Sequence, residues 1–266
     1  MRLLLTLEIQ NSNVLPINYN YPLSAAIYKL LKFGSTEFAS FLHDIGYKLN
    51  GKTYKLFSFA LVTDKIKFGS KCIYVSSKQI RLYISSPLVD DFIQNFVIGT
   101  FHQQKIEISD GEIKLVFLIR QVETLLFPQL ANTSEFILLS PMVLSTVKEN
   151  GGNFSQYYFR CSDDIDDINR VLNQNLINKY ELINSRKYEG SGLILRWDEK
   201  YISRKLSENK RLTKKISIVK KGERPIEIIG IEVPFTLTGD VELMRVGYDC
   251  GFGEKNSMGF GLAEMI

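Results

Sequence analysis

Four glycines, a lysine and several polar residues crowd together in Gly251-Phe252-Gly253-Glu254-Lys255-Asn256-Ser257-Met258-Gly259-Phe260-Gly261. Core packing alone does not explain why so many glycines fall in so short a segment. Successive exposed amides in such a turn form an anion-binding concavity, so we expect this glycine-rich loop to contact phosphate. A phosphate-binding loop for a nucleotide is normally followed by a helix, but the residues after this loop predict a short strand. A mononucleotide pocket is therefore not expected. The candidate contact residues are Gly251, Gly253, Lys255, Asn256, Ser257 and Gly259.

One of the only two histidines, His43, follows a helical run and is a candidate for proton transfer. An imidazole has an ordinary pKa of about 6.5 and acts as acid or base near neutral pH. In the preceding helix, Ile27 belongs to the buried stripe and Tyr28 lies about 100° round from it. The Gly34-Ser35 turn folds the next helix back, so we expect Tyr28 and His43 to share a cleft. Taken alone, a helix-end histidine is more often a capping or surface residue than a catalytic one, and such a tyrosine is more often a core aromatic.

Positive charge gathers in one segment, although the net charge of +4 and the pI of about 8.8 are mild. Between Arg204 and Arg224 the basic residues are opposed only by Glu208 and Glu223. Such a segment is either a solvated surface or a nucleic-acid-binding one, and together with the glycine-rich loop RNA is favoured. The basic residues are Arg204, Lys205, Lys210, Arg211, Lys214, Lys215, Lys220, Lys221 and Arg224.

Length and composition bound the class of protein. A chain of 266 residues with 45% hydrophobic content forms a core in one large or two smaller domains. No secretory leader and no apolar run of about 20 residues is recognised, so we expect a cytoplasmic protein that does not span a membrane. Cys72, Cys161 and Cys250 lack the paired spacing of zinc sites, and we expect reduced thiols, no metal and no cofactor.

The first half of the sequence predicts a β-α-β-β-α-β order, from strand alternation, helical apolar faces and the Asp110-Gly111 turn signal. The expected segments are a strand over 2–9, a helix over 24–33, a short helix after Gly34, extended segments over 56–63, 71–75 and 79–84, a helix around Phe92, and strands over 105–109 and 113–120.

The second half predicts the same order again. A helix is announced by the acidic cluster between Asp163 and Asp167, where carboxylates complement the helix dipole. We therefore predict an α+β chain of two tandem ferredoxin-like domains, over 1–128 and 129–266, with the boundary near 122–133. The expected segments are a strand over 135–144, the helix with its stripe of Ile165, Ile168, Leu172 and Leu176, strands over 192–197 and 226–235, a short helix over 240–246 and a closing strand after Met258.

Val246-Gly247-Tyr248, leading into the glycine-rich loop, resembles the C-terminal signature of the CRISPR repeat-RNA processing endoribonucleases. That family belongs to a larger group of RNA-binding proteins that are built from ferredoxin-like domains and share the loop. In the first half, Ile27-Tyr28, Phe41-Leu42-His43-Asp44 and Lys55-Leu56-Phe57-Ser58-Phe59 resemble the Tyr, His and Lys positions of the family, in that order.

The resemblance implies that Tyr28 and His43 are the acid and base pair and that Lys55 steadies the phosphate. Lys48 and Lys52 remain alternatives to Lys55, because the segment 45–54 varies in length among such proteins. The implied reaction is metal-independent: the ribose 2′-hydroxyl attacks the adjacent phosphorus, leaving a 2′,3′-cyclic phosphate and a 5′-hydroxyl. A phenol, with an ordinary pKa of about 10, suits proton donation, which favours His43 as base and Tyr28 as acid.

The implied substrate is CRISPR repeat RNA in the precursor transcript, cleaved to release guide RNAs. Two rival classes remain. A non-catalytic RNA-binding subunit of a CRISPR effector complex needs no Tyr, His and Lys set, so Tyr28 and His43 argue against it. A metal-dependent nuclease needs a cluster of acidic ligands that the sequence does not show. The sequence leaves open the partners in an effector complex, a homodimer, the fold of the repeat and the cleavage position.

Overall fold

The computed structural model describes residues 1–218 and 225–266, in two compact units. Unit 1 comprises Met1–Phe127 together with Ser257–Gly259, and unit 2 comprises Pro128–Asn256 together with Phe260–Ile266. The glycine-rich loop is therefore divided: its tip, Ser257–Gly259, is counted with unit 1 and the rest with unit 2.

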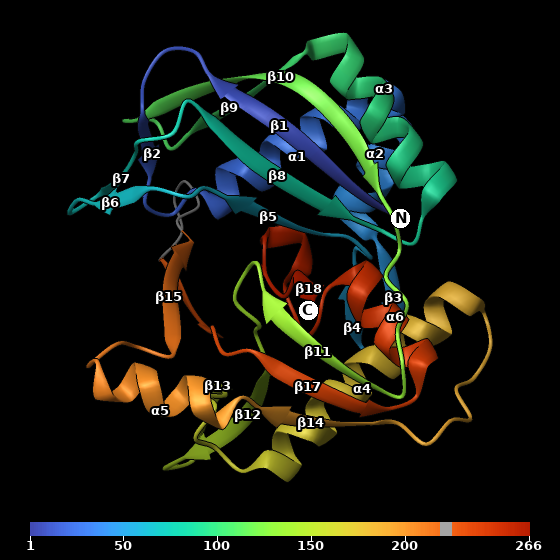
Figure 1. Ribbon diagram of the computed structural model, residues 1–266. Helices are drawn as coiled ribbons and strands as arrows, with labels where there is room; N and C mark the ends of the chain where they lie inside the picture. The colour runs from blue at the N-terminus through green and yellow to red at the C-terminus, as the bar shows by residue number, and fades with distance from the viewer. Residues whose placement is uncertain (219–224) are drawn as a thin grey trace. The chain divides into compact units, whose positions relative to one another are not determined.

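Unit 1 is built on a five-stranded antiparallel sheet with strand order β5-β8-β1-β10-β9. The first four strands of that order have the arrangement of a ferredoxin-like fold, and β9 adds a hairpin partner at one edge. The helices lie against one face of the sheet (Figure 1). The elements are β1 (Arg2–Ile9), α1 (Asn20–Gly34), β5 (Ser58–Val62), β8 (Gln79–Ser85), α3 (Gln94–Gln103), β9 (Lys105–Ser109) and β10 (Lys114–Leu125).

The core of unit 1 follows the two periodicities of the sequence. Leu3, Leu5 and Leu7 alternate along β1 and are buried, while Leu23 and Ile27 fall on the buried face of α1. Each fully buried side chain of this size contributes about 1.5–3 kcal/mol. Tyr28, next to Ile27 on α1, lies at the margin of this core and is only partly buried. This partial exposure matters for the site.

Shorter elements complete unit 1, of which the sequence predicted the short helix after Gly34 and the extended segment over 71–75 but not the other strands or the π-helical turns. A three-stranded sheet and a small hairpin lie outside the main sheet, and two π-helical turns follow α2 and precede α3. These elements are β2 (Val14–Pro16), β6 (Ile66–Phe68) and β7 (Cys72–Val75) in the small sheet, β3 (Tyr47–Leu49) and β4 (Lys52–Tyr54) in the hairpin, α2 (Thr36–Ser40), and the π-helical turns Phe41–Ile45 and Val89–Ile93.

Unit 2 repeats the fold with a four-stranded antiparallel sheet, in the order β14-β17-β11-β18. Two helices lie against one face of this sheet (Figure 1). Asp164 caps the first of them, because its Oδ1 accepts hydrogen bonds from the amides of Asp166 and Asp167. The elements are β11 (Thr133–Leu138), α4 (Ile165–Asn184), β14 (Leu193–Trp197), β17 (Phe235–Gly239), α6 (Val241–Cys250), a short 3-10 turn (Asn256–Met258) and β18 (Ala263–Met265).

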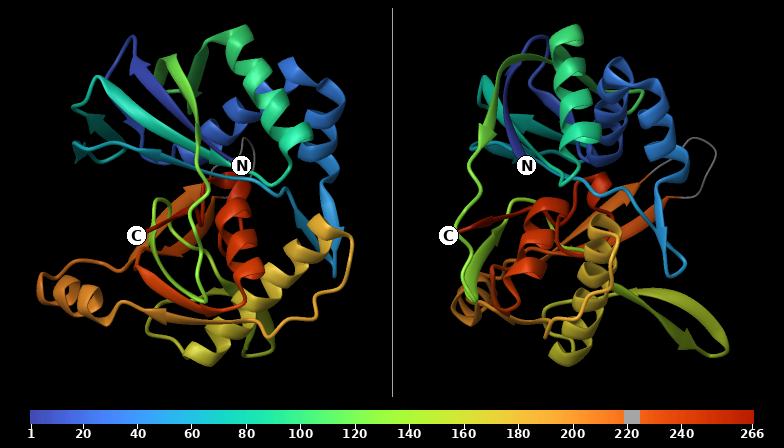
Figure 2. Two further views of the ribbon diagram at one scale, coloured as in Figure 1. Left: turned by 45° about the vertical axis from the view of Figure 1, so that its right-hand side comes forward. Right: turned by 90° about the vertical axis from the view of Figure 1, so that its right-hand side faces the viewer.

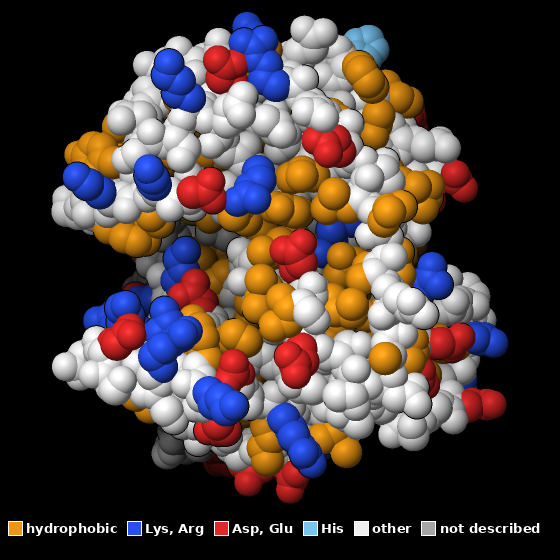
Figure 3. Space-filling view, in the orientation of Figure 1, with side chains coloured by type: hydrophobic (Ala, Val, Ile, Leu, Met, Phe, Trp, Pro, Cys, Tyr) orange, Lys and Arg blue, Asp and Glu red, His pale blue; other side chains and the backbone are white. Residues whose placement is uncertain are grey.

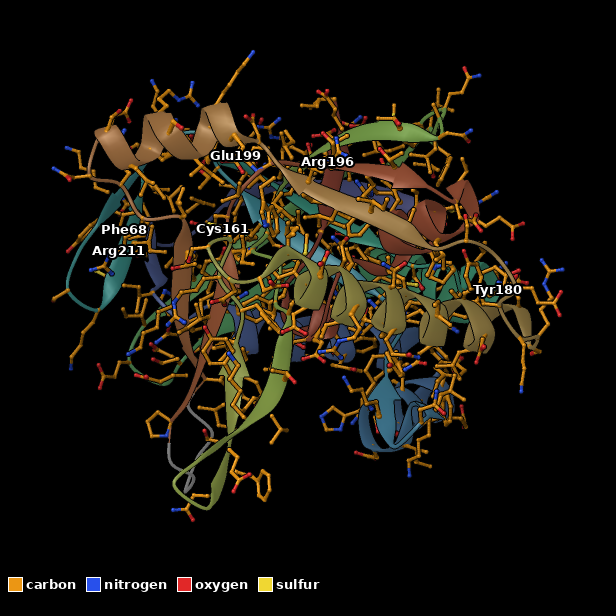
Figure 4. The ribbon with its side chains drawn as sticks, turned by 90° about the horizontal axis from the view of Figure 1, so that it is seen from below. Phe68, Cys161, Tyr180, Arg196, Glu199 and Arg211 are labelled. Atoms are coloured by element: carbon orange, nitrogen blue, oxygen red, sulfur yellow. The ribbon has the colours of Figure 1, made fainter. Side chains whose placement is uncertain are left out.

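Two hairpins and a short helix are inserted into unit 2. The hairpin of β12 (Ser145–Asn150) and β13 (Asn153–Tyr158) projects from the rest of its unit (Figure 2). The second hairpin pairs β15 (Thr213–Ile218) with β16 (Ile226–Ile231), and α5 (Glu199–Ser207) precedes it. In Figure 4, Arg196 lies on β14 and Glu199 at the beginning of α5.

One predicted core strand of unit 2 is wrong. The sequence placed the third strand of the sheet over 226–235, whereas β16 pairs only with β15 and the third strand is β17. Pro234 lies between β16 and β17, and a proline has no amide to continue a ladder. The strand expected over 135–144 likewise ends at Leu138, shortly before Pro141.

The prediction of two ferredoxin-like domains in an α+β chain is confirmed, although two strand ranges in unit 2 were wrong and several of the short inserted elements were not foreseen. Among the helices of residues 1–218 and 225–266, none combines the length and the apolar content required to cross a membrane.

Candidate active site

Tyr28 and His43 lie in direct contact in unit 1. Their ring centroids are 5.1 Å apart and the rings meet edge to face at 89°. Tyr28 comes from the middle of α1, and His43 from the π-helical turn Phe41–Ile45, which follows α2 without a break. The chain reverses at Ser35, whose hydroxyl caps α2 by accepting from the amide of Phe38 at 3.1 Å.

Asp44 holds the imidazole from its outer side. Nδ1 of His43 lies 2.6 Å from Oδ1 of Asp44, and both side chains are exposed. The hydrogen bond from His43 holds the pKa of the Asp44 carboxyl below its ordinary value. When Nδ1 of a neutral imidazole donates to this carboxylate, Nε2 is left with its lone pair and is free to accept a proton.

Lys55 is the lysine that the structure brings to His43. Its ammonium donates to the backbone oxygen of His43 at 2.8 Å. Burial lowers the pKa of Lys55, the charge of Asp44 opposes that effect, and the neighbouring Lys48 adds to it. Lys48 and Lys52, the two alternatives, belong to the β3–β4 hairpin and are exposed.

Tyr28 is held between His43, the core and the tip of the glycine-rich loop. Its ring also packs edge to face on Phe57, with centroids 5.7 Å apart. Burial raises the pKa of the Tyr28 phenol, and a hydrogen bond with the side chain of Ser257 acts in the opposite direction. The phenol therefore stays protonated at and well above neutral pH, and it can donate a hydrogen bond.

Two residues of α1 that the sequence reasoning missed also hold the loop tip. Asn20 Nδ2 donates to the backbone oxygens of Met258 and Gly259, and Ser24 Oγ donates to that of Ser257. The available signal was their spacing, because Asn20 and Ser24 precede Tyr28 by eight and four residues on the same helix face.

The part of the glycine-rich loop in unit 2 is organised around a buried lysine. Lys179 of α4 is 2% exposed. Its ammonium donates to the backbone oxygens of Gly251 and Gly253 and to Oδ1 of Asn256, at 2.7 to 2.8 Å. Sequence reasoning missed Lys179, although it falls on the same helical stripe as Leu172 and Leu176.

Packing explains more of the glycine content than we expected from the sequence. A Cβ on Gly253 would lie 2.3 Å from the backbone oxygen of Val143, and one on Gly261 would lie 1.9 Å from that of Phe252. The side chain of Asn256 is buried and bonds within the loop, to Phe252 and Phe260 as well as to Lys179. These residues shape the loop, while Lys255, with φ +58°, and Ser257 are partly exposed on it.

The described part of the basic segment spans α5, the turn after it and β15. Arg204 and Lys205 are at the end of α5, within 5.4 Å and 5.2 Å of the ring centroid of Tyr201. Lys and Arg side chains are seen over β15 and beside α5 in Figure 3. Lys210 pairs with Glu208 and Lys215 with Glu227, whereas Arg211 and Lys214 lie between them in sequence. Lys220, Lys221 and Arg224 lie outside the described residues.

Acidic and sulfur ligands do not cluster in the described ranges, 1–218 and 225–266: no three His, Cys, Asp or Glu side chains are grouped as a metal site requires. Cys72, Cys161 and Cys250 are free thiols.

Two ferredoxin-like units and a glycine-rich loop place this chain in the class of tandem ferredoxin-like proteins that carry such a loop. Two family models cover nearly all of it: "CRISPR-associated protein Cas6, N-terminal" matches residues 14–123, and "CRISPR associated protein Cas6, C-terminal" matches 127–265. The chain belongs to the Cas6 family, and the resemblance seen in the sequence is confirmed.

Individual relatives agree with this membership. The chain is 31% identical to CRISPR-associated endoribonuclease Cas6 1 of Methanocaldococcus jannaschii, over 98% of this chain and 91% of the relative. A solved structure described as "CRISPR associated protein Cas6" has a TM-score of 0.74 at 27% identity, covering 100% of this chain and 99% of the other. A second, a Cas6-related gene product from Pyrococcus furiosus, has a TM-score of 0.80 at 24% identity, covering 100% and 98%.

Proposed function

We propose that this protein is an endoribonuclease that cleaves CRISPR repeat RNA in a precursor transcript without a metal ion, using Tyr28, His43 and Lys55. Membership of the Cas6 family and the name of the M. jannaschii relative support the substrate class. The observation that carries the mechanism is the contact between the Tyr28 and His43 rings, with the Lys55 ammonium bonded to the His43 backbone.

The geometry favours His43 as the base and Tyr28 as the acid. His43 donates through Nδ1 to Asp44, so Nε2 takes the proton of the ribose 2′-hydroxyl. The bond from the 2′-oxygen to phosphorus forms as the bond to the 5′-oxygen breaks. The 5′-oxygen takes the leaving electron pair and a proton from Tyr28. The products are a 2′,3′-cyclic phosphate and a 5′-hydroxyl.

Lys55 supplies positive charge where the phosphate becomes more negative. Its ammonium is anchored to the His43 backbone, which keeps the charge beside the imidazole during the reaction. Removing one such electrostatic donor from an active site typically reduces the rate by about 10² to 10³.

Recognition of the RNA falls to residues that were predicted from the charge pattern and from the glycine-rich loop. Arg204, Lys205 and Arg211 offer cationic side chains to the sugar-phosphate backbone, and Lys255 and Ser257 lie on the partly exposed side of the glycine-rich loop. Sequence-specific contacts are expected at unpaired bases, because an RNA duplex hides its major-groove edges. CRISPR effector subunits and a second copy of the chain remain candidate partners.

The first experiment separates this reaction from its rivals. The purified protein is incubated in excess EDTA with its CRISPR repeat RNA, and in parallel with the same RNA carrying a single 2′-deoxy substitution at the mapped cut. Cleavage of the first RNA and not the second is expected. Cleavage that EDTA abolishes would indicate a metal-dependent nuclease, and binding without cleavage of either RNA would indicate a non-catalytic subunit.

His43→Ala tests the site itself, with His102→Ala as the matched control. His102 is the other histidine, exposed on α3, where it stacks on Phe33. We expect His43→Ala to reduce the single-turnover rate by about 10² to 10⁴ while RNA binding is kept, and His102→Ala to cleave as the parent does. An unchanged rate in His43→Ala would refute the mechanism.

A further inference from the structure

Gly46 joins the π-helical turn that carries His43 to the β3–β4 hairpin. Its backbone has φ +65° and ψ −172°, a conformation that is essentially restricted to glycine. The Gly46 amide donates to the backbone oxygen of Phe41 at 2.8 Å and closes the turn. Tyr47, the next residue, packs edge to face on Phe41, with ring centroids 5.3 Å apart. The direction in which the chain leaves the turn is therefore fixed on both sides of Gly46.

The space beside Gly46 is occupied by the end of the Lys55 side chain. A Cβ on Gly46 would lie 2.9 Å from both Cδ and Nζ of Lys55, and 2.9 Å from the backbone oxygen of Tyr54. Non-bonded carbon atoms are normally about 3.5–4.0 Å apart, so this Cβ and the present position of the Lys55 side chain exclude each other. From that position the Lys55 ammonium donates to the backbone oxygen of His43 at 2.8 Å.

The Lys55 ammonium is the group that a side chain at position 46 would displace. A lysine ammonium ends a flexible four-carbon stem and can move to another rotamer. The Tyr54 carbonyl, by contrast, belongs to the β3–β4 ladder, in which Tyr54 is paired with Tyr47. The hairpin backbone therefore resists a shift that the lysine can make, and the hydrogen bond to the His43 backbone would be lost first.

We infer that Gly46 is a positioning residue for Lys55, because the absence of a side chain at this position leaves the space in which the ammonium reaches the His43 backbone. The inference rests on the proposed function, in which Lys55 stabilises negative charge on the phosphate. Gly46 has no side chain with which to act on the RNA, so its effect reaches the reaction through Lys55. Displacement of a catalytic group by about 1 Å can reduce a rate about 10²-fold, so the effect is expected in the chemical step.

A double-mutant cycle between Gly46 and Lys55 separates this role from a structural one. The single-turnover rate with saturating protein is measured for Gly46→Ala, for Lys55→Ala and for the double variant. Gly51→Ala is the matched control, because Gly51 lies in the turn of the same hairpin and also has a positive φ, of +72°. A Cβ on Gly51 meets no atom within 4 Å, so this control places an alanine at positive φ without the contact.

We expect Gly46→Ala to reduce the rate about 10-fold to 10²-fold with RNA affinity close to that of the parent, and Gly51→Ala to cleave as the parent does. In the Lys55→Ala background, Gly46→Ala is expected to cause no further loss, since the group that it displaces is already absent. An equal loss in both backgrounds would overturn the inference, because it would indicate a glycine required by the backbone alone. A parent rate for Gly46→Ala would also overturn it.

The double variant also decides the outcome if Gly46→Ala fails to fold. Truncating Lys55 to Ala removes Cδ and Nζ, the two side-chain atoms that the new Cβ would meet. Circular dichroism and urea denaturation report whether each variant is folded. Recovery of the fold in the double variant would support the contact with Lys55 as the cause. Failure of the double variant as well would show that the backbone conformation alone demands glycine, and the inference would fall.

Lys55→Ala by itself distinguishes failure of this inference from failure of the proposed function. If Lys55→Ala cleaves at the parent rate, Lys55 does not stabilise the reacting phosphate, and the role of Gly46 falls with it. If Lys55→Ala slows cleavage by the expected factor of about 10² to 10³ but the losses from the two substitutions multiply, the proposed function stands and Gly46 is a structural glycine.

Discussion

Burial shifts the pKa of Tyr28 and the pKa of Lys55 in opposite directions, for the same physical reason. Desolvation disfavours the charged form of any group. It raises the pKa of the Tyr28 phenol, whose charged form is the phenolate, and lowers the pKa of the Lys55 ammonium. Tyr28 therefore keeps its proton as the pH rises, while Lys55 loses its proton earlier than an exposed lysine does.

The alkaline side of the pH–rate profile is therefore expected to report Lys55. Below the lowered pKa of Lys55 its charge is fully present, and the rate falls as the pH rises through that pKa. Lys55→Arg keeps a guanidinium charged at every pH of interest, so the fall moves to higher pH. Single-turnover rates from about pH 6 to about pH 10 measure this, corrected for uncatalysed RNA hydrolysis. Lys48→Arg is the matched control, and an identical alkaline fall in Lys55→Arg would assign that limb to another group.

At the scale of elements, the sequence predicted the structure correctly where a single periodicity of apolar residues determines it. The helical stripe through Ile27 placed Tyr28 about 100° round the helix from the buried face, and the turn after Gly34 predicted that the following helical segment would bring His43 back toward it. The sequence did not predict that Ser24 would bind the loop tip, because that contact joins segments more than 230 residues apart. The false strand over 226–235 arose because an apolar β-branched run fits an inserted hairpin as well as a core strand.

The buried lysine of α4 gives a prediction at the same scale. Lys179→Met keeps the length of the side chain but leaves the oxygens of Gly251, Gly253 and Asn256 without their donor. We expect it to lower the free energy of unfolding by about 2–4 kcal/mol. Urea denaturation followed by fluorescence measures this, since the single tryptophan, Trp197, is buried in β14 of the same unit.

Arg170→Met is the control for Lys179→Met. Arg170 is an exposed cation of the same helix, paired with Asp167 three residues away at 2.7 Å. An exposed pair of this kind contributes about 0–1 kcal/mol. If Lys179→Met were no more destabilising than Arg170→Met, Lys179 would not be the residue that organises the glycine-rich loop.

At the scale of the whole molecule, the two ferredoxin-like units carry different parts of the proposed function. Unit 1 holds the proposed proton-transfer groups. Its helical elements hold the rings of Tyr28 and His43 in direct contact. Unit 2 holds the basic segment on α5 and β15, the proposed contact for the phosphate backbone, which flexible cationic side chains bind without demanding one geometry. This division predicts that chemistry and affinity respond to different substitutions.

Substitutions in the basic segment test this division of roles, and the salt dependence of RNA binding is the measurement. Replacing Arg204 and Arg211 together by Gln lowers the net charge from +4 to +2. If each arginine neutralises one phosphate of single-stranded RNA, the slope of log K against log salt falls in magnitude by about 1.4. The loss then appears in affinity, because contacts to the phosphate backbone hold substrate and transition state alike. Lys105→Gln with Lys114→Gln, exposed on the β9–β10 hairpin, makes the same charge change and is expected to leave the slope as it is. Equal slopes for both pairs of substitutions would show that net charge, not the basic segment, governs RNA binding.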